Sequence, residues 1–482
     1  MTNCASCVTV WATSLITHGQ LTGFDMHGIL STLMFVAPGW VRDVITHEKQ
    51  PNVFWSEYVV WPLIQIVIVL FIVLTLVAYL VYLERKVSAF MQARLGPMRV
   101  GPWGLLQPAA DGLKLLLKED IIPLKADRAV FILAPIVSVV AALVVLAVIP
   151  WGAAWATIAN VNIGLLFILA VSSVGVLGLV LAGWGSNSKY SLLGALRSSA
   201  QMVSYEIGMG LSIIGALMFA RTLSMSGIID AQRADGIWYV FFQPLGFLIY
   251  AVSALGETNR APFDLPEAES ELVAGYHTEY SGFRWALFFM AEYSAMIVTS
   301  AVAVTVFLGG WMFPGLTGTS LFGLGPIANP TLHTLVSIIV FAGKVMLLIY
   351  IYMWFRWTWP RYRYDQLMEL GWKWMIPAGL ANIVLTGIWY VLALPKAQGG
   401  LWGFMREVNK RLVPTWPAGI LYFIGTAFVV TIPIVWGLLV TINRRSRDFN
   451  LHEQRQLQMQ LRRERLEKML QEQPQPAETA GT

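Results

Sequence analysis

Six carboxylates are crowded into the 25 residues from Gly256 to Tyr280, between two apolar segments long enough to cross a membrane. Arg260 is the only lysine or arginine there, and His277 is the only other titratable base. Carboxylates packed beside a low-dielectric region raise one another's pKa and can hold protons near neutral pH. These residue types at this spacing therefore indicate proton handling. The six acids are Glu257, Asp264, Glu267, Glu269, Glu271 and Glu279.

The order of residues within this acidic segment predicts a local helix. Asp264 can cap its first turn, which would contain Pro266 and Glu267. Glu267 and Glu271 would then lie one turn apart on the same face, where two ionised carboxylates repel each other. The pattern favours acids that share protons or are balanced by cations on neighbouring elements. The alternative is a solvated acidic face, although apolar residues are interleaved with the acids.

Three more ionisable residues, Glu206, Glu292 and Lys344, lie inside apolar segments of membrane length. A charge in hydrocarbon is costly, so such side chains usually face the interior of a helix bundle or a hydrated path. The alternative for each is a static buried pair, or a side chain that extends to the membrane surface. This alternative is strongest for Glu292, which lies about two turns into its segment.

The composition predicts an all-α polytopic membrane protein. Hydrophobic residues make up 56% of the chain and charged residues 13%, against roughly 25% charged residues in a soluble domain. Nine apolar segments reach the roughly 20 residues that a membrane-spanning helix needs, and none alternates as a barrel strand would. The first eight lie between residues 58 and 394, and the ninth follows near the C-terminus. The segments are 58–83, 130–150, 162–183, 199–220, 237–255, 285–308, 333–355, 375–394 and 417–442.

The basic residues of the connecting segments predict the orientation in the membrane. One set of loops and the C-terminal tail hold 24 lysines and arginines, whereas the other set holds eight. Since basic residues accumulate on the cytoplasmic side, we expect the N-terminus outside and the C-terminus in the cytoplasm. The net charge of +5 then reflects topology and does not indicate nucleic-acid binding. The acidic segment would face the cytoplasm.

Other motifs exclude several kinds of chemistry. Cys4 and Cys7 are the only cysteines, and two ligands do not complete a zinc or iron–sulfur site, so a chance pair or a local disulfide is favoured. No basic residue precedes position 42, so the charged start of a cleavable signal peptide is missing. The Gly183-x-Gly185-x-x-Ser188 spacing lacks the strand and βαβ unit of a dinucleotide site.

Two further patterns predict elements at the membrane surface. The first apolar segment is predicted to end at Glu84-Arg85-Lys86, with cations anchoring its inner end. Residues 105–118 are apolar on one helical face and polar on the other, which predicts an amphipathic helix on the membrane surface or under a soluble partner.

We divide the chain into an external extension (1–56), an eight-helix core (57–395), an external connection (396–416), an extra transmembrane helix (417–442) and a charged cytoplasmic tail (443–482). Within the tail, residues 459–470 could form a short helix.

Several strings are together specific enough to indicate a family. They are the acidic segment followed by ALFFMAEY (286–293), Glu84-Arg85-Lys86, Arg94-x-Gly-Pro97, Gln107-Pro108-x-Ala-Asp111-Gly112, Lys114, Lys118-Glu119, SLLGALRSSAQMVSYEI (191–207) and PRYRYDQLMELGWK (360–373). Together they closely resemble the family of the membrane quinone-site subunit (subunit 1) of respiratory complex I, whose members lie beside the quinone site. The resemblance covers about residues 57–395 in the family's order. The extension before it and the ninth helix with its tail lie outside it, and we expect them to contact accessory subunits.

The resemblance implies a narrow chamber, shared with the peripheral arm, which a ubiquinone or menaquinone headgroup enters from the membrane. It also implies a chain of glutamates from that chamber toward antiporter-like subunits, reached through small membrane subunits. NADH, FMN and iron–sulfur clusters would be held by partner subunits, so this chain would not be catalytic alone. The implied quinone-site residues are Arg85, Arg94, Asp111 and Lys114. Those of the proton pathway are Glu119, Glu206, Glu257, Asp264, Glu267, Glu269, Glu271, Glu279 and Glu292. Those that compensate charge are Arg260, Lys344, Arg361 and Arg363.

Three alternatives to a proton-translocating NADH:quinone oxidoreductase subunit of the bacterial inner membrane stay open. A homologous subunit could serve a membrane-bound hydrogenase or a dehydrogenase that uses another electron donor. A stand-alone ion-coupled transporter would also carry buried charges, but no inverted repeat is evident and a six-acid cytoplasmic loop would be unusual. A non-catalytic scaffold would tolerate replacement of its glutamates.

Overall fold

The computed structural model describes residues 59–153, 156–235, 238–264, 274–313, 330–393, 458–460 and 462. Every regular element in these ranges is helical. The predicted N-terminal extension, external connection and ninth transmembrane helix lie outside the described residues, as does most of the tail, where residues 458–460 and 462 are helical. The elements are α5 (Trp61–Met91), η2 (Pro102–Gly104), α6 (Gln107–Leu117), α7 (Arg128–Val144), η3 (Val145–Ala147), α8 (Gly164–Gly185), α9 (Lys189–Ala220), α10 (Met225–Asp235), α11 (Tyr239–Phe242), α12 (Pro244–Glu257), η5 (Gly275–His277), α14 (Gly282–Phe307), α15 (Pro330–Thr358), α16 (Tyr364–Glu369), η6 (Leu370–Met375) and α17 (Ile376–Ala393).

Six helical segments of the described chain are long and apolar enough to cross a membrane: α5, α7 with η3, α8, α9, α14 and α15. The all-helical membrane fold is thus confirmed, whereas the predicted count of eight core spans is not. The predicted span 237–255 forms two helices, because the helix breaks at Gln243 (φ −127°, ψ 53°) before Pro244. Proline disfavours a helical residue before it and lacks the N–H of a continuous helix. The second piece, α12, is a shorter apolar helix of 14 residues.

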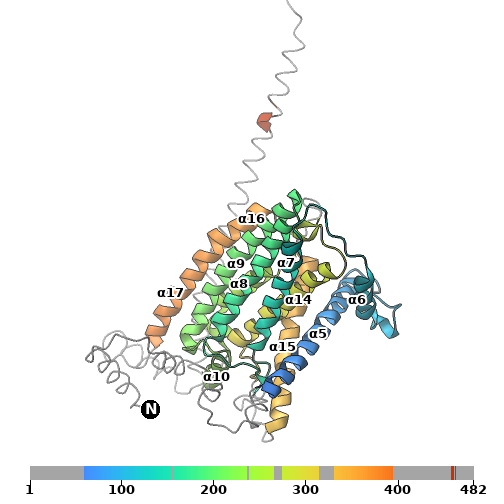
Figure 1. Ribbon diagram of the computed structural model, residues 1–482. Helices are drawn as coiled ribbons and strands as arrows, with labels where there is room; N and C mark the ends of the chain where they lie inside the picture. The colour runs from blue at the N-terminus through green and yellow to red at the C-terminus, as the bar shows by residue number, and fades with distance from the viewer. Residues whose placement is uncertain are drawn as a thin grey trace, which may run out of the picture. The chain divides into compact units, whose positions relative to one another are not determined.

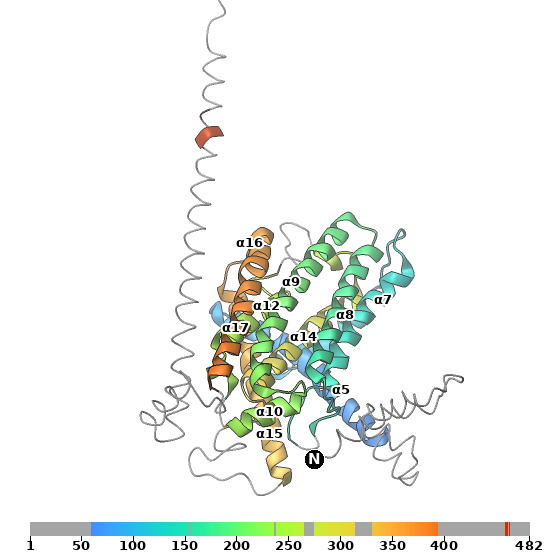
Figure 2. The ribbon, with the colours of Figure 1, turned by 90° about the vertical axis from the view of Figure 1, so that its left-hand side faces the viewer.

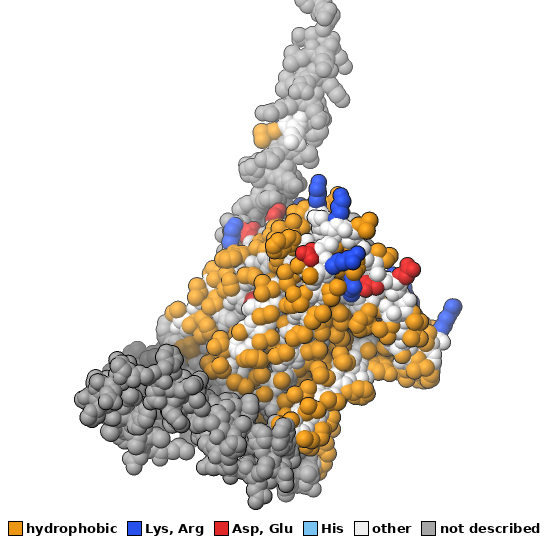
Figure 3. Space-filling view, in the orientation of Figure 1, with side chains coloured by type: hydrophobic (Ala, Val, Ile, Leu, Met, Phe, Trp, Pro, Cys, Tyr) orange, Lys and Arg blue, Asp and Glu red, His pale blue; other side chains and the backbone are white. Residues whose placement is uncertain are grey.

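The long helices pack into one cluster around α9. Helix α9 contacts α8, α12 and α17, α8 packs against α7, and α14 packs against α7 and α15 (Figures 1 and 2). Buried tyrosines bond between two further pairs, α12 with α14 and α9 with α16: the Tyr250 hydroxyl donates to Thr299 O at 2.8 Å, and the Tyr205 hydroxyl to Leu367 O at 3.1 Å. Figure 3 shows hydrophobic side chains along the helices and charged side chains toward the end at which α7 and α9 begin.

Helices α7 and α8 approach closely at a glycine. A Cβ atom on Gly178 would lie 2.1 Å from Ser138 Oγ, 3.0 Å from Ser138 N and 3.1 Å from Ala134 O. Two of these three atoms belong to the backbone of α7, so a side-chain rotation cannot relieve the clash. Small residues at such positions allow membrane helices to pack backbone to backbone.

Gly178→Ala should therefore lower the stability of the protein by about 1–3 kcal/mol, the usual cost of overpacking a tight contact. The measurement is the unfolding temperature of the detergent-solubilised protein. Gly210→Ala is the matched control, because a Cβ atom on Gly210 meets nothing within 4 Å and alanine is the better helix former. Equal unfolding temperatures for the two variants would contradict the close α7–α8 contact.

Candidate functional site

A buried cluster of opposite charges joins α5, α14, α15 and the turn after α12. Arg260, in that turn, donates from Nη1 to both carboxylate oxygens of Glu84 at 3.0 Å, and its Nε lies 2.5 Å from Glu292 Oε1. Arg356 also donates to Glu84, and the Tyr293 hydroxyl donates to the same carboxylate at 2.5 Å. Two carboxylates and two guanidinium groups therefore share one site.

Burial couples the charges of this cluster strongly. The side chains of Arg260 and Glu84 are 4% and 7% exposed, and the guanidinium of Arg260 lies 4.2 Å from the centroid of the Tyr293 ring. Burial by itself would lower the pKa of Arg260, but the carboxylates of Glu292 and Glu84 outweigh it and hold that pKa well above its usual range. Arg260 therefore stays a cation. Removing this guanidinium, or the carboxylates that it pairs with, would leave the opposite charge buried without that partner.

The sequence-based assignment of site residues omitted Glu84, Tyr293 and Arg356. Helix α5 continues beyond the predicted end of the first span, to Met91, and Glu84 faces inward. A signal was present in the spacing, since steps of three and four residues place Glu84 on the apolar face of α5. The buried residues at these steps are Val73, Val77, Leu80, Glu84 and Ser88.

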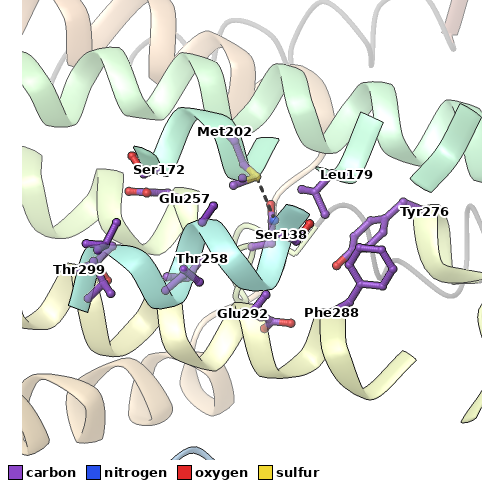
Figure 4. A pocket seen from close by; sticks show the side chains of 18 residues that line it. Ser138, Ser172, Leu179, Met202, Glu257, Thr258, Tyr276, Phe288, Glu292 and Thr299 are labelled. Carbon is purple, nitrogen blue, oxygen red and sulfur yellow. Dashed lines mark hydrogen bonds between the residues drawn. The ribbon is translucent and has the colours of Figure 1, made fainter. Parts of the chain in front are cut away.

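A cavity of about 90 Å³ lies between α7, α8, α9, α12 and α14 (Figure 4). Glu257, the last residue of α12, and Glu292 of α14 both line it. Glu257 is buried, and its Oε2 atom has no hydrogen-bond partner among the described residues. Ser138, Thr258 and Asn259 add polar groups to the walls. The walls are mainly apolar, but a cavity of this size is large enough for water, and the two carboxylates and these polar groups offer hydrogen-bond partners for it.

Ser172 connects this cavity with Glu206. It lines the cavity, and its Oγ donates to Glu206 Oε1 at 3.2 Å, while Ser173 donates to the same oxygen. Glu206 is also close enough to Glu257 for their charges to interact. Since Glu206 is half-buried and Ser173 exposed, this carboxylate lies at an edge of the described helices. The structure thus brings three of the predicted proton-pathway residues together: Glu292 and Glu257 line one cavity, and Glu206 is hydrogen-bonded to Ser172 in its wall.

The start of the acidic segment, residues 256–264, is held against neighbouring elements. Gln201 of α9 donates from Nε2 to Gly256 O at 2.8 Å and to Phe263 O at 2.7 Å. Arg361, just before α16, donates to Asp264 at 3.1 Å. These bonds fix the turn that carries Arg260 into the charge cluster.

Comparisons with known proteins identify the family of this chain. A family model described as NADH dehydrogenase matches residues 64–387. An NADH-quinone oxidoreductase subunit of Rhodospirillum rubrum is 50% identical over 337 residues, which cover 69% of this chain and 96% of the relative. The chain belongs to the NADH dehydrogenase family of NADH-quinone oxidoreductase subunits. A corresponding NADH-quinone oxidoreductase subunit of Koribacter versatilis is 46% identical over 389 residues (68% of this chain, 91% of the relative), and NADH-quinone oxidoreductase subunit 8 of Rhodothermus marinus is 50% identical over 323 residues (64% and 91%).

Two of the four quinone-site residues that this family implies form a pair at the end of α5. Arg85 Nη1 lies 2.7 Å from Asp111 Oδ2 of α6, and Gln107 donates to the other oxygen of Asp111 at 3.0 Å. Arg94 and Lys114 are exposed. The predicted amphipathic helix forms as α6, and none of its residues is buried. Its apolar face is therefore free to meet a membrane or a partner.

The other predicted residues lie away from the cavity or outside the described residues. Glu119 is exposed and Glu279 half-buried, in the segments before α7 and α14. Arg363 is exposed, and its backbone N–H donates to the Gln366 side chain at 3.3 Å. Lys344 donates to backbone carbonyls near the end of α14. The predicted helix after Asp264 lies outside the described residues, with Glu267, Glu269 and Glu271.

Proposed function

We propose that this chain is the membrane subunit of a proton-translocating NADH:quinone oxidoreductase that couples quinone reduction to proton transfer. The names of its relatives support the electron donor and acceptor. The observation that carries the coupling role is the arrangement of ionisable groups from Glu84, through Arg260 and Glu292, to the cavity that Glu257 also lines, and on to Glu206 through the lining residue Ser172. A subunit with only a scaffold role would not need these buried or half-buried acids in and beside one cavity.

We propose that the quinone end of this pathway lies at α5 and α6. Arg85 and Glu84 are adjacent on α5, yet Arg85 points to Asp111 while Glu84 bonds Arg260 inside the protein. The segment that follows α5 and the helix α6 carry exposed apolar side chains that suit an isoprenoid tail; they are Leu95, Trp103, Leu106 and Leu113. The peripheral-arm subunits would complete the chamber and supply electrons from NADH through FMN and iron–sulfur clusters.

The residues of this chain would couple the two ends by electrostatics. Quinone reduction to quinol consumes two protons, and a transient negative charge near Arg85 changes the field at Glu84, one residue away. In a low-dielectric site such a change shifts the proton affinity of nearby carboxylates. Since Arg260 bonds both Glu84 and Glu292, a weaker bond to one carboxylate allows a stronger bond to the other. Glu292 can then exchange a proton with the cavity.

The half-buried Glu206 would pass protons on to small membrane subunits that lead to antiporter-like subunits. Its place at the edge formed by α8 and α9 supports this, because the neighbouring Ser173 and Leu177 are exposed. The excess of basic residues on one side supports a bacterial inner-membrane location with the N-terminus outside and the C-terminus in the cytoplasm.

Glu206→Gln tests this function. The amide keeps the shape of the side chain but cannot release a proton, so proton pumping per NADH oxidised should fall on the order of tenfold. The measurement is proton uptake by membrane vesicles, with NADH oxidation by an artificial acceptor as the check on assembly. Glu369→Gln is the matched control, because Glu369 lies near the surface and pairs with Lys373. Wild-type pumping in assembled Glu206→Gln would remove Glu206 from the pathway.

A further inference from the structure

Lys344, in the middle of α15, directs its ammonium group at a turn of the backbone. Its Nζ donates to the carbonyl oxygens of Leu308, Gly310 and Met312 at 2.6, 2.9 and 2.6 Å. An ammonium group has three donors and no acceptor, so these bonds use its full capacity. The same group lies 4.5 Å from the centroid of the Trp238 ring, a distance that adds a cation–π attraction.

The backbone at the end of α14 aims these oxygens at one point. Helix α14 ends at Phe307, and the last carbonyls of a helix lack intrahelical donors. Gly309 and Gly310 follow with φ of +70° and +56°, conformations that favour glycine. The turn closes through Leu308 N and Gly310 N, which both donate to Val304 O, at 3.1 and 2.8 Å. Because the C-terminal end of a helix is also the negative end of its dipole, the turn favours a cation.

We propose that the turn 308–312 is a cation-binding cage and that Lys344 supplies its cation from the neighbouring helix. The matching ligand class is a primary ammonium ion, because its three N–H donors correspond to the three carbonyl acceptors. Shortening the side chain at position 344 opens the cage to an ammonium ion from solution. This binding site does not depend on the role of the protein in proton coupling.

The cage fixes α15 relative to α14 at the end opposite the charge cluster. Arg356 lies 12 residues after Lys344 on α15, about 18 Å along the helix, and bonds Glu84 in that cluster. Glu292 of α14 belongs to the same cluster. The cage therefore links α15 to the end of α14, whereas Arg356 links α15 to Glu84 of α5 in the charge cluster.

Lys344→Ala in the full complex tests the cage with propylammonium chloride as the probe. We expect the variant to unfold at least about 3 °C below the wild type, and propylammonium at about 50 mM, a concentration that suits a weak ionic site, to restore at least half of that loss. Neither the wild type nor Lys373→Ala should respond, because Lys373 is exposed and, among the described residues, forms an ion pair with its i,i+4 neighbour Glu369. Tetramethylammonium, which has no N–H donor, should not restore stability.

Three results would overturn the proposal: no restoration by propylammonium, equal restoration by potassium or tetramethylammonium, or a Lys344→Met variant as stable as the wild type. If Lys344→Ala does not assemble, the amounts of assembled complex are compared between Lys344→Gln and Lys344→Met instead. The glutamine amide keeps N–H donors for the carbonyls, so its complex should accumulate to at least twice the level of the methionine variant. Equal levels would contradict the cage. Since these readouts are stability and assembly, a failure here leaves the proposed coupling function intact.

Discussion

Arg260→Met should nearly abolish assembly of the complex. The substitution leaves Glu84 and Glu292 facing each other in a buried site with only Arg356 to balance them, where Arg260 now bonds both. Removing one partner of a buried ion pair typically costs 3–5 kcal/mol, a large fraction of the stability of most proteins. The measurement is the amount of intact complex in membranes, by native gel, with the unfolding temperature of what survives.

The matched control for this prediction is Lys373→Met. Lys373 pairs with Glu369 at 3.0 Å, and both side chains are exposed (58% and 39%). Exposed pairs contribute about 0–1 kcal/mol, so this variant should assemble. A wild-type level of Arg260→Met complex would show that the buried cluster is not essential.

The same cluster predicts a rescue. Arg260→Met combined with Glu292→Gln leaves Glu84 paired with Arg356, so the site is neutral again. The double variant should accumulate to a higher level than Arg260→Met alone, a non-additivity expected only for interacting residues. Additive losses would mean that Glu292 and Arg260 are not coupled.

Ala295→Leu should block proton transfer while all the acids stay in place. Ala295 lines the cavity that Glu257 and Glu292 share, and the larger side chain would occupy the space for water with hydrocarbon. Proton transfer needs direct hydrogen-bond contact or a water bridge, and its loss costs on the order of 10²-fold or more in a step that depends on it. We expect quinone-linked proton pumping to fall by that order.

Ala295→Ser is the control for the cavity, because it adds one polar atom and leaves room for water. Pumping should stay close to the wild-type level in this variant. If Ala295→Leu does not assemble, Ala295→Val makes a smaller intrusion and should give an intermediate loss. Full pumping with a filled cavity would place the proton route elsewhere, even if Glu206→Gln is inactive.

Much of this protein could be predicted from composition and motif. The apolar segments correspond to helices α5, α8, α14 and α15 with small shifts of their ends, and the 105–118 pattern corresponds to α6. The family assignment followed from strings that are long and ordered, and the match over residues 64–387 agrees with it. These features are local, because helical periodicity and sequence motifs both depend on residues that are close together in the chain.

The pairing of charges could not be predicted in this way. From the sequence, Arg260 seemed to be the one cation available to six neighbouring acids, whereas in the fold it bonds Glu84 and Glu292, neither of which belongs to that acidic segment. Glu84 is 176 residues from Arg260 and 272 from Arg356. Periodicity shows which face of a helix is buried, but not which helix it meets.

The sequence therefore determined which acids lie in or beside the apolar segments, and the tertiary structure determined which groups they contact. The sequence alone placed Glu206, Glu257 and Glu292 in or beside apolar segments, where charges are costly and usually functional. Only the packing of α7, α8, α9, α12 and α14 formed a cavity that Glu257 and Glu292 line and set its wall residue Ser172 beside Glu206. Only the turn after α14 showed that Lys344 bonds carbonyl oxygens. The physical reason is that a buried charge must find a partner within a few ångströms in space, at any distance along the chain.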